Sequence, residues 1–369
     1  MTKKMRIMYV MGGSMKRAGA ETMIMQYLRQ LIHEDAFEFS ILVHGNDQGD
    51  YDEEIRSMGV PIYHVPVRGQ HPFTYNREVS KVLKEHPVDI VHCNMDNASG
   101  HFLKIAKKCS IPIRIAHSHT TRILAKNPIK KIIGAISKQE IHVTATHRLA
   151  CSKKAGDWLF GADTYEIVNN AINLEQYKFN PQVRDEIRDK LHISADTLVL
   201  CHIGSFSYPK NHKGLLHMFK ELKQIRPDSK LLLAGVGPLM DSIKELTRRM
   251  ELQNDVVFLG LCSDVPALLQ AADIFVMPSL MEGLPVAGIE AQAAGIPCYF
   301  ADTITPEVCM TDQAKRVSLQ SIDAWVNEIA KTSKIRADRE ANKALTMRGY
   351  NIKKEAEKLA NYYKSIFEG

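Results

Sequence analysis

The sequence lacks long apolar runs and paired cysteines. No stretch approaches the ~20 consecutive apolar residues of a membrane-spanning helix, and the apolar run in the opening MTKKMRIMYVMGG is too short for a signal peptide. The seven cysteines are scattered without a C-x-x-C pair, which argues against a zinc site and against a disulfide framework. We therefore expect a cytoplasmic protein that is soluble or peripheral on the inner face of the cell membrane.

The length and the repeated apolar runs indicate a two-domain α/β protein. The 369 residues exceed the ~250–300 at which single hydrophobic cores stop growing. Short apolar runs alternate with helical segments, as in parallel sheets built by right-handed crossovers. The expected strands are Met5–Met11, Phe39–His44, Ile62–Val65, Asp89–Cys93, Ile113–Ala116, Arg148–Cys151, Leu198–Ile203, Leu231–Ala234, Val256–Gly260, Asp273–Met277 and Ile296–Phe300, and helices are expected at Thr22–His33 and around Asn351–Ile366.

The most informative stretch is residues 273–300, DIFVMPSLMEGLPVAGIEAQAAGIPCYF, which predicts a strand, a loop, a helix and a strand. Proline suits the first position of a helix and glycine the left-handed residue after its end, so the helix should start at Pro285 and end before Gly295. The loop Glu282–Pro285 then follows the first strand, where open α/β sheets bind ligands. Free amides and the helix dipole favour an anion there.

Two carboxylates, Glu282 and Glu290, accompany this anion site. A site built only for phosphate charge would avoid them. Carboxylates accept hydrogen bonds from hydroxyl groups, so the pair indicates a phosphorylated sugar or a nucleotide whose ribose is held. The alternative is that both are glutamates favoured near a helix start by the dipole.

The pattern E-x7-E within DIFVMPSLMEGLPVAGIEAQAAGIPC resembles the donor-site signature of family-four retaining glycosyltransferases, and the resemblance covers nearly the whole chain. It is similar to the bacterial subgroup of capsule and exopolysaccharide synthesis. The resemblance implies the GT-B fold, two Rossmann-like domains with parallel sheets facing a cleft. The acceptor domain would span residues 1–175 and the donor domain 176–349, and a helix in 350–369 would pack back on the first domain.

The resemblance also assigns donor-site roles in the second domain. Lys210 would neutralise the diphosphate and act in catalysis, and the amides around Leu284 and Val286 would stabilise the leaving phosphate. Glu290 would hold the ribose hydroxyls. Glu282 would bind the donor sugar at the reacting centre.

One departure from the family pattern concerns the loop after the strand Leu198–Ile203. The family carries an arginine directly after the glycine of this loop, whereas Ser205 stands here. Lys213 could replace it as a point charge, without the planar fork of a guanidinium. In the family the nucleobase is held by the backbone at the position of Leu261. Backbone contacts do not depend on the side chain, so the sequence does not predict which base is bound.

The first domain offers a glycine loop and two histidines. Gly19-Ala-Glu21 matches the family's G-G-x-E loop, with Ala18 in place of the first glycine, and would approach the sugar diphosphate. The family also has a histidine near the donor sugar after the strand Ile113–Ala116. His119 fits that position somewhat better than His117, and both remain candidates; the alternative is that each only caps the strand end.

Residues 104–154 hold twelve lysines or arginines and one acidic residue, Glu140, a net charge of about +11. Within them Arg122–Ile136 mixes isoleucine and leucine with basic residues, as interfacial helices do. We expect attraction to an anionic membrane surface, at ~1 kcal/mol per basic residue, where a polyprenyl-linked acceptor would be presented. A solvated face without a partner is an alternative, and nucleic-acid binding is disfavoured because interleaved aromatic residues are missing.

No metal or organic cofactor is expected. Asp50-Tyr-Asp52 is the only D-x-D, and it lies in a polar, glycine-bearing segment where aspartates serve turns. We therefore predict a metal-independent hexosyltransferase that moves a sugar from a nucleotide diphosphate sugar, with a UDP-sugar as the expected donor, to the hydroxyl of a glycan or polyprenyl-linked acceptor with retention. A non-catalytic sensor or scaffold, motivated by Ser205, and a sugar-nucleotide epimerase are the alternatives.

Overall fold

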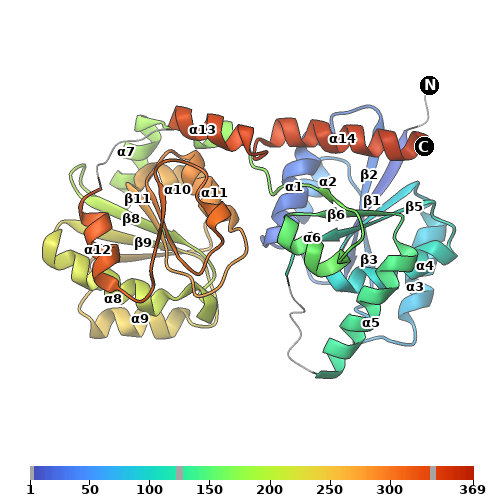
Figure 1. Cartoon of the computed structure of the whole chain (residues 1–369), viewed down its shortest axis with the longest axis horizontal. Helices are drawn as coiled ribbons and strands as arrows, with labels where there is room; N and C mark the ends of the chain where they lie inside the picture. The colour runs from blue at the N-terminus through green and yellow to red at the C-terminus, as the bar shows by residue number, and fades with distance from the viewer. Residues whose placement is uncertain (1–3, 122–127, 333–337) are drawn as a thin grey trace. The chain divides into compact units, whose positions relative to one another are not determined.

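The computed structural model describes residues 4–121, 128–332 and 338–369. The chain forms two compact units and passes between them twice. Unit 1 comprises Met1–Ile172 and Ile352–Gly369, and unit 2 comprises Asn173–Asn351. Each unit is a parallel sheet with helices on both of its faces (Figure 1).

The sheet of unit 1 has seven strands in the order β3-β2-β1-β4-β5-β6-β7, and every neighbouring pair is parallel. The central strands are nearly continuous apolar runs because helices cover both of their faces. The strands are β1 Met5–Met11, β2 Phe37–His44, β3 Ile62–Val65, β4 Ile90–Asn94, β5 Ile113–Ser118, β6 His147–Ala150 and β7 Glu166–Ile167.

The helices of unit 1 divide between the two faces of this sheet. On one face α1 (Gly19–Leu31) packs against α14 (Ile352–Glu368), and on the other α4 (Ser99–Lys108) packs against α5 (Pro128–Thr144). Buried residues of α14 recur at helical spacing, as an amphipathic helix requires. The closing helix expected to return to the first domain is thereby confirmed. The other helices are α2 Asp52–Ser57, α3 Tyr75–Glu85 and α6 Lys153–Phe160.

The sheet of unit 2 has six strands in the order β10-β9-β8-β11-β12-β13, again all parallel. Its order reverses between β8 and β11, and ligands of open α/β sheets bind outside the carboxyl ends of the strands at such a point. The strands are β8 Leu198–Ile203, β9 Ser229–Ala234, β10 Val256–Gly260, β11 Ile274–Met277, β12 Cys298–Ala301 and β13 Ala314–Val317.

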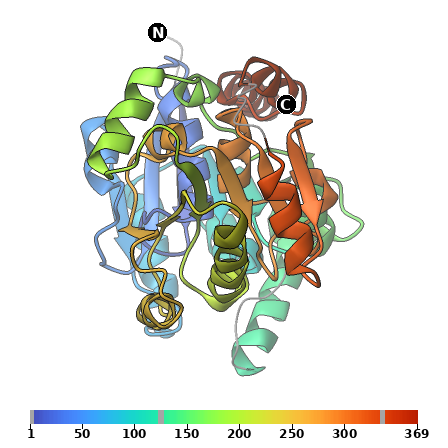
Figure 2. The same ribbon diagram turned by 90° about the vertical axis from the view of Figure 1, so that its left-hand side faces the viewer.

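The helices of unit 2 also pack in pairs. α8 (His212–Ile225) lies beside α12 (Ile322–Ala330), which Figure 2 shows in front of the sheet. α7 (Pro181–Lys190) packs against α10 (Val265–Ala271). The remaining helices are α9 Met240–Arg249, α11 Val286–Ala293 and α13 Asp338–Met347.

All the expected strands are present, with ends that shift by at most two residues. The helix expected to start at Pro285 begins at Val286 instead, because Pro285 keeps an extended backbone with ψ of 124°. Gly295 has the expected left-handed φ of 67° after the helix end. β7 and β13 were not anticipated, since both are short edge strands without an apolar run.

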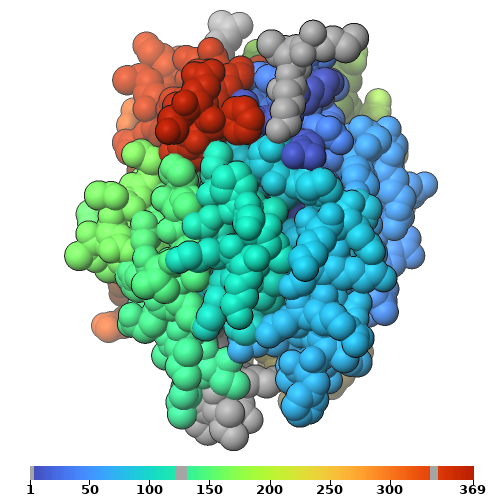
Figure 3. All heavy atoms as spheres, turned by 90° about the vertical axis from the view of Figure 1, so that its right-hand side faces the viewer, coloured from blue at the N-terminus to red at the C-terminus, as the bar shows by residue number. Residues whose placement is uncertain are grey.

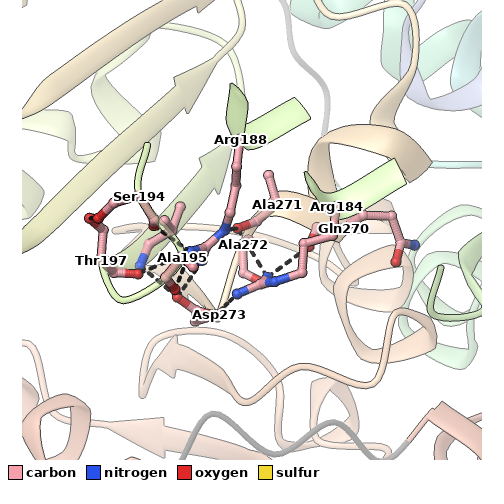
Figure 4. A network of polar contacts seen from close by, with 10 residues as sticks. Arg184, Arg188, Ser194, Ala195, Thr197, Gln270, Ala271, Ala272 and Asp273 are labelled. Carbon is pink, nitrogen blue, oxygen red and sulfur yellow. Dashed lines mark hydrogen bonds and ion pairs between the residues drawn. The ribbon is translucent and has the colours of Figure 1, made fainter. Parts of the chain in front are cut away.

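A buried ion-pair network ties α7 to the start of β11 (Figure 4). The carboxylate of Asp273 accepts from Arg184 at 2.5 Å and from Arg188 at 2.8 Å, and the Val199 amide donates to it at 2.8 Å. Arg188 also donates to four backbone carbonyl oxygens, those of Ala271, Ser194, Ala195 and Thr197. The side chains of Asp273 and Arg188 are each only 3% exposed, so removing the carboxylate would leave buried positive charge unpaired.

We predict that Asp273→Ala lowers the free energy of unfolding of unit 2 by about 3–5 kcal/mol, the usual cost of breaking a buried ion pair. Trp325 in α12 reports on unit 2 alone when the other tryptophan, Trp158 in α6, is replaced by phenylalanine. Urea unfolding followed by its fluorescence measures the change.

Glu328→Ala is the matched control, because it breaks the exposed pair with Lys315, which is worth ~0–1 kcal/mol. An equal loss for Asp273→Ala and Glu328→Ala would contradict the role given to the buried network.

Candidate functional site

Two loops of unit 2, one after β8 and one after β11, are hydrogen-bonded to each other. The Leu280 amide donates to the Pro209 carbonyl at 2.7 Å, and the side-chain amide of Asn211 donates to the Pro278 carbonyl at 3.0 Å. Asn211 has a left-handed backbone with φ of 54°, and its side-chain oxygen caps α8 by accepting from the Gly214 amide. The two loops therefore form one rigid rim at the carboxyl edge of the sheet.

This rim brings together two of the three charged groups predicted for the donor site. Lys210 Nζ lies 2.5 Å from Glu282 Oε1, and the two side chains are 19% and 15% exposed. Sequence reasoning placed both residues at one ligand but not against each other. A phosphate oxygen that approaches Lys210 competes with Glu282 for the ammonium group, and a carboxylate released from it could accept from hydroxyl groups.

The neighbouring Ser205, at the position of the missing arginine, is exposed and shares a hydrogen bond of 3.0 Å with the hydroxyl of Ser207. Lys213, the candidate replacement, is exposed in the first turn of α8. Gly235, with φ of 136°, closes the next loop so tightly that an added Cβ would lie 2.1 Å from the Gly204 carbonyl oxygen. This close approach holds the backbone of the loop after β8 at Gly204, although the family's arginine is absent from that loop.

Glu290 lies in α11 and is held by a residue that sequence reasoning missed. Tyr177, in the short 3-10 turn Leu174–Tyr177, donates its hydroxyl to Glu290 Oε1 at 2.8 Å. Burial raises the pKa of the Glu290 carboxyl, and the hydrogen bond from Tyr177 opposes this rise. Within the described chain, Glu290 Oε2 makes no hydrogen bond and remains an acceptor for a ligand hydroxyl.

Three more positions were predicted for the donor site. Leu284 and Val286 precede Glu290 in the sequence, and Leu261 lies at the carboxyl edge of the same sheet. Leu284 and Val286, at the start of α11, are half-buried, and no side chain of the described residues caps the amino terminus of this helix. Its first amides can therefore face an anion. Leu261 follows β10 and is 57% exposed.

Two histidines near the rim, His202 and His212, are buried, and neither was predicted from the sequence to belong to the site. His202 Nδ1 donates to the Val276 carbonyl at 2.8 Å, so Nε2 carries the lone pair, and it has no partner in the described structure. The ring of His212 is stacked on Phe206 with centroids 4.1 Å apart. Burial lowers the pKa of His202 to about 3 and that of His212 to about 4, so both are neutral near pH 7.

Unit 1 has a second polar cluster at the carboxyl ends of β4 and β5. His92 Nε2 lies 2.9 Å from His117 Nδ1, and the rings of His117 and His119 lie 4.1 Å apart. His117 is fully buried, whereas His119 is half-buried. Burial lowers the pKa of all three imidazoles, that of His92 to about 3, so the cluster is neutral. Of the two predicted histidines, only His119 therefore keeps surface that is exposed to solvent.

A chain of hydrogen bonds fixes the proton positions of the buried pair. Tyr363 in α14 donates to the Tyr9 hydroxyl at 3.2 Å, so its oxygen accepts from His92 Nδ1 at 2.6 Å. His92 Nε2 then accepts from His117 Nδ1. The remaining nitrogen, His117 Nε2, is a buried acceptor without a partner among the described residues.

The glycine loop and the D-x-D segment have distinct surroundings. Gly19 is the first residue of α1, and Glu21 follows in its first turn, where burial and then the nearby Asp96 raise the pKa of its carboxyl. Asp50 accepts from the Arg17 amide at 2.8 Å, and Asp52 accepts from the Gly49 amide at 3.1 Å. Asp50 thus holds the glycine loop, and Asp52 holds its own turn. No group of three or more potential metal ligands occurs among the described residues.

Comparison with known proteins agrees with these two units. The family description "Glycosyltransferase Family 4" matches residues 17–176, and "Glycosyl transferases group 1" matches residues 183–352. EpsF of Bacillus subtilis, named as a glycosyltransferase, is 36% identical over 97% of this chain and 96% of its own length. An Escherichia coli UDP-Gal:alpha-D-GlcNAc-diphosphoundecaprenol alpha-1,3-galactosyltransferase is 26% identical over 77% of each chain.

The crystal structure of Anabaena HepE in complex with UDP has the same fold, with a TM-score of 0.80 at 19% identity over 98% of this chain and 100% of that one. The two parallel α/β units and the helix that returns to unit 1 define the GT-B fold. More specifically, the chain belongs to the family-four glycosyltransferases, and it is an enzyme of that family.

The buried histidines predict an acid-sensitive fold. Above about pH 6.5 His202 is neutral in both the folded and the unfolded chain, so its protonation contributes nothing to stability. Between about pH 6.5 and about pH 3 only the unfolded chain binds the proton, so stability falls with decreasing pH, by about 1.4 kcal/mol per pH unit for this histidine. Urea unfolding of unit 2 at pH 4, 5, 6 and 7 measures the slope.

His202→Asn retains a donor to the Val276 carbonyl and should reduce this slope by about 1.4 kcal/mol per pH unit. The control is His192→Gln, which replaces an exposed histidine of the same unit. A slope that His202→Asn does not alter would show that His202 already binds its proton in the folded protein.

Proposed function

We propose that this glycosyltransferase moves a hexose from a UDP-sugar to a hydroxyl of a lipid-linked glycan, with retention of configuration, in capsule or exopolysaccharide synthesis. The observation that carries the proposal is the pairing of Lys210 with Glu282, which stands eight positions before Glu290 in the sequence: a cation for a diphosphate together with two acceptors for hydroxyl groups. The names of two similar proteins support the nucleotide and the acceptor class: HepE was crystallised with UDP, and the E. coli enzyme uses UDP-Gal and a diphosphoundecaprenol acceptor.

In this mechanism the difficult step is departure of the phosphate oxygen from the anomeric carbon. Lys210 leaves Glu282 and binds the diphosphate, and the first amides of α11 around Leu284 and Val286 stabilise the charge that develops on the leaving oxygens. Glu282 then accepts from hydroxyl groups of the donor sugar. The bond from the anomeric carbon to the acceptor oxygen forms on the face that the phosphate leaves, and the phosphate takes the acceptor proton.

Three other positions complete the proposed assignment. The backbone at Leu261 holds the uracil base, and Gly19 at the start of α1 allows close approach of the sugar diphosphate. In unit 1, His119 contacts a sugar hydroxyl. His117 is fully buried and supports His119 from behind.

The proposal predicts that UDP stabilises the protein more than GDP or ADP, because ligand binding raises stability by about 2.7 kcal/mol at a hundredfold excess over Kd. Thermal shift and calorimetry measure this preference. Lys210→Ala should weaken UDP binding, leave uridine binding unchanged and lower kcat by about 10²–10³-fold. The control is Lys220→Ala, which removes an exposed lysine of α8.

A preference for another nucleotide, or equal loss of uridine and UDP binding in Lys210→Ala, would contradict the assignment. Tight nucleotide binding without turnover on any acceptor would favour a sensor or scaffold, as the exposed Ser205 allows. Conversion of the donor sugar without an acceptor would favour an epimerase.

The roles of Glu290 and Tyr177 can be tested together with a modified ligand. Glu290→Ala should raise the Kd for UDP by about tenfold or more, because hydrogen bonds to a charged group are worth ~1.5–3 kcal/mol. Tyr177→Phe should raise Kd less, since it removes only the hydrogen bond that orients the carboxylate. Calorimetry with UDP and with 2′,3′-dideoxy-UDP measures both effects.

If Glu290 holds the ribose hydroxyls, Glu290→Ala and removal of these hydroxyls from the ligand abolish the same contact. The loss of binding free energy for the two changes together should then be no larger than for either change alone. Fully additive penalties would place the ribose elsewhere.

For the lipid-linked acceptor we propose that α5 contacts an anionic membrane surface. α4 crosses α5 so closely that a Cβ added at Gly100 would lie 1.8 Å from the Ser137 carbonyl oxygen. The residues of α5 before this crossing project beyond the other helices of unit 1 (Figures 1 and 2). Ile132 and Ile136, one turn apart on this part of α5, are 62% and 58% exposed, and Figure 3 shows the surface of unit 1 on which α5 lies.

The expected basic segment contributes less free charge than its composition indicates. Lys104 pairs with Glu140 at 2.7 Å, and Arg148 pairs with Asp163 at 3.0 Å. Arg114 donates to backbone carbonyl oxygens, among them that of Thr144 at 2.7 Å. Arg122 and Lys126 lie outside the described residues. We therefore expect burial of the apolar face of α5 to contribute more to membrane binding than the positive charge of residues 104–154.

Ile132→Asn together with Ile136→Asn should lower binding to vesicles that contain phosphatidylglycerol by at least about tenfold, because burying one isoleucine side chain is worth ~1.5–3 kcal/mol. Vesicle pelleting measures the bound fraction. The control is Ile225→Asn, which changes an isoleucine of α8 that is 54% exposed. Equal pelleting with zwitterionic vesicles, or an equal effect of the control, would contradict the membrane contact.

A further inference from the structure

Two neighbouring strands of unit 1 bring four polar residues to one face of the sheet. β4 carries His92 and Asn94, and His117 and His119 lie at the end of β5, in each case two residues apart. Side chains two residues apart on a strand point to the same face, and β4 pairs with β5. The half-buried His119 therefore lies beside Asn94.

The orientation of the Asn94 amide is fixed by its two hydrogen bonds. Its nitrogen Nδ2 donates to the His92 carbonyl at 3.1 Å, which leaves the oxygen Oδ1 facing His119 Nε2 at 2.9 Å. An amide oxygen only accepts, so His119 Nε2 must carry the proton. In a neutral imidazole the lone pair is then on Nδ1.

The backbone of His119 is held as firmly as its ring. Asp96 Oδ1 accepts from the His119 amide at 2.6 Å and from the Thr120 amide at 2.9 Å. The ring of His117 supports the ring of His119 at a centroid distance of 4.1 Å. Nδ1 of His119 makes no hydrogen bond with the described residues, so the cluster presents a nitrogen acceptor in a fixed position.

We propose that Asn94 is a positioning residue for sugar transfer: it fixes His119 as the Nε2–H tautomer, so that Nδ1 accepts a hydrogen bond from a hydroxyl of the sugar substrate. This inference rests on the proposed function and adds to it the kind of group that the site selects. A hydroxyl can donate to Nδ1, whereas a carboxylate or carbonyl oxygen at the same position would meet its lone pair. The site therefore favours a neutral hexose over a uronic acid at this point.

The tautomer can be read directly by nitrogen NMR of the full-length protein with ¹⁵N-labelled histidine. The His119 signals are assigned by their loss in His119→Gln. In the wild type, Nε2 should have the shift of a protonated ring nitrogen and Nδ1 that of an unprotonated one. Asn94→Leu and the milder Asn94→Ala should move both shifts toward the opposite tautomer.

The matched control is Asn76→Leu, because Asn76 Oδ1 bonds His101 Nε2 at 2.8 Å in the same unit, outside the His119 cluster. It should change the His101 signals and leave those of His119 unchanged. A wild-type His119 that carries its proton on Nδ1 would overturn the inference, as would unchanged His119 signals in both Asn94 variants.

Kinetics separate a positioning role from a structural one. With UDP-glucose, UDP-galactose and UDP-N-acetylglucosamine as probes, UDP release by Asn94→Leu should fall about three- to tenfold in kcat/KM, as for one lost hydrogen bond. Among monodeoxy analogues of the donor or acceptor sugar, one should show the same loss with the wild type and no further loss with Asn94→Leu.

A changed tautomer with unchanged kcat/KM would overturn the positioning role and leave the proposed function intact. Absence of turnover with every donor would instead refute the proposed function. The NMR result would still decide whether Asn94 fixes the His119 ring.

Discussion

In each sheet every strand runs parallel to its neighbours, and this constraint places all the loops that follow the strands along one edge. The order of unit 2 then sets β8 next to β11, so that the loops bearing Lys210 and Glu282 meet although they are far apart in the sequence. In unit 1 the same rule sets β4 beside β5 and brings Asn94 to His119. The candidate chemistry of both units is a consequence of strand direction and strand order.

The two candidate carboxylates of unit 2 are held in different ways. Glu282 is paired with the cation Lys210, and a negatively charged ligand can exchange with it for that partner. Glu290 accepts a hydrogen bond from the hydroxyl of Tyr177. Because this hydroxyl is neutral, a phosphate does not compete for it as it does for the ammonium group of Lys210. In the proposed mechanism one carboxylate therefore changes partners when a diphosphate binds, while the other remains in place as a fixed acceptor. Such a division suits a ligand with a charged centre and hydroxyl groups on both sides of it.

Much of this fold could be predicted from the sequence, because buried parallel strands are short apolar runs and the E-x7-E stretch carries its own helix signals. The edge strands Glu166–Ile167 and Ala314–Val317 could not be predicted, since neither is an apolar run. Contacts in the site between distant segments could not be predicted from the sequence either. Tyr177 and Glu290, for example, are 113 positions apart and meet only through tertiary packing. His92 and Asn94 did leave a signal, because His92 lies in the expected strand Asp89–Cys93 and Asn94 follows it directly, two residues further on.

The most direct test of the account is a crystal structure of the protein with UDP bound. We expect Lys210 Nζ on a diphosphate oxygen and no longer on Glu282, Glu290 Oε2 within hydrogen-bond distance of the ribose hydroxyls, and the base against the backbone at Leu261. UDP bound while the pair of Lys210 and Glu282 stays intact and Glu290 lies beyond hydrogen-bond distance of the ribose would contradict the donor site described for this enzyme.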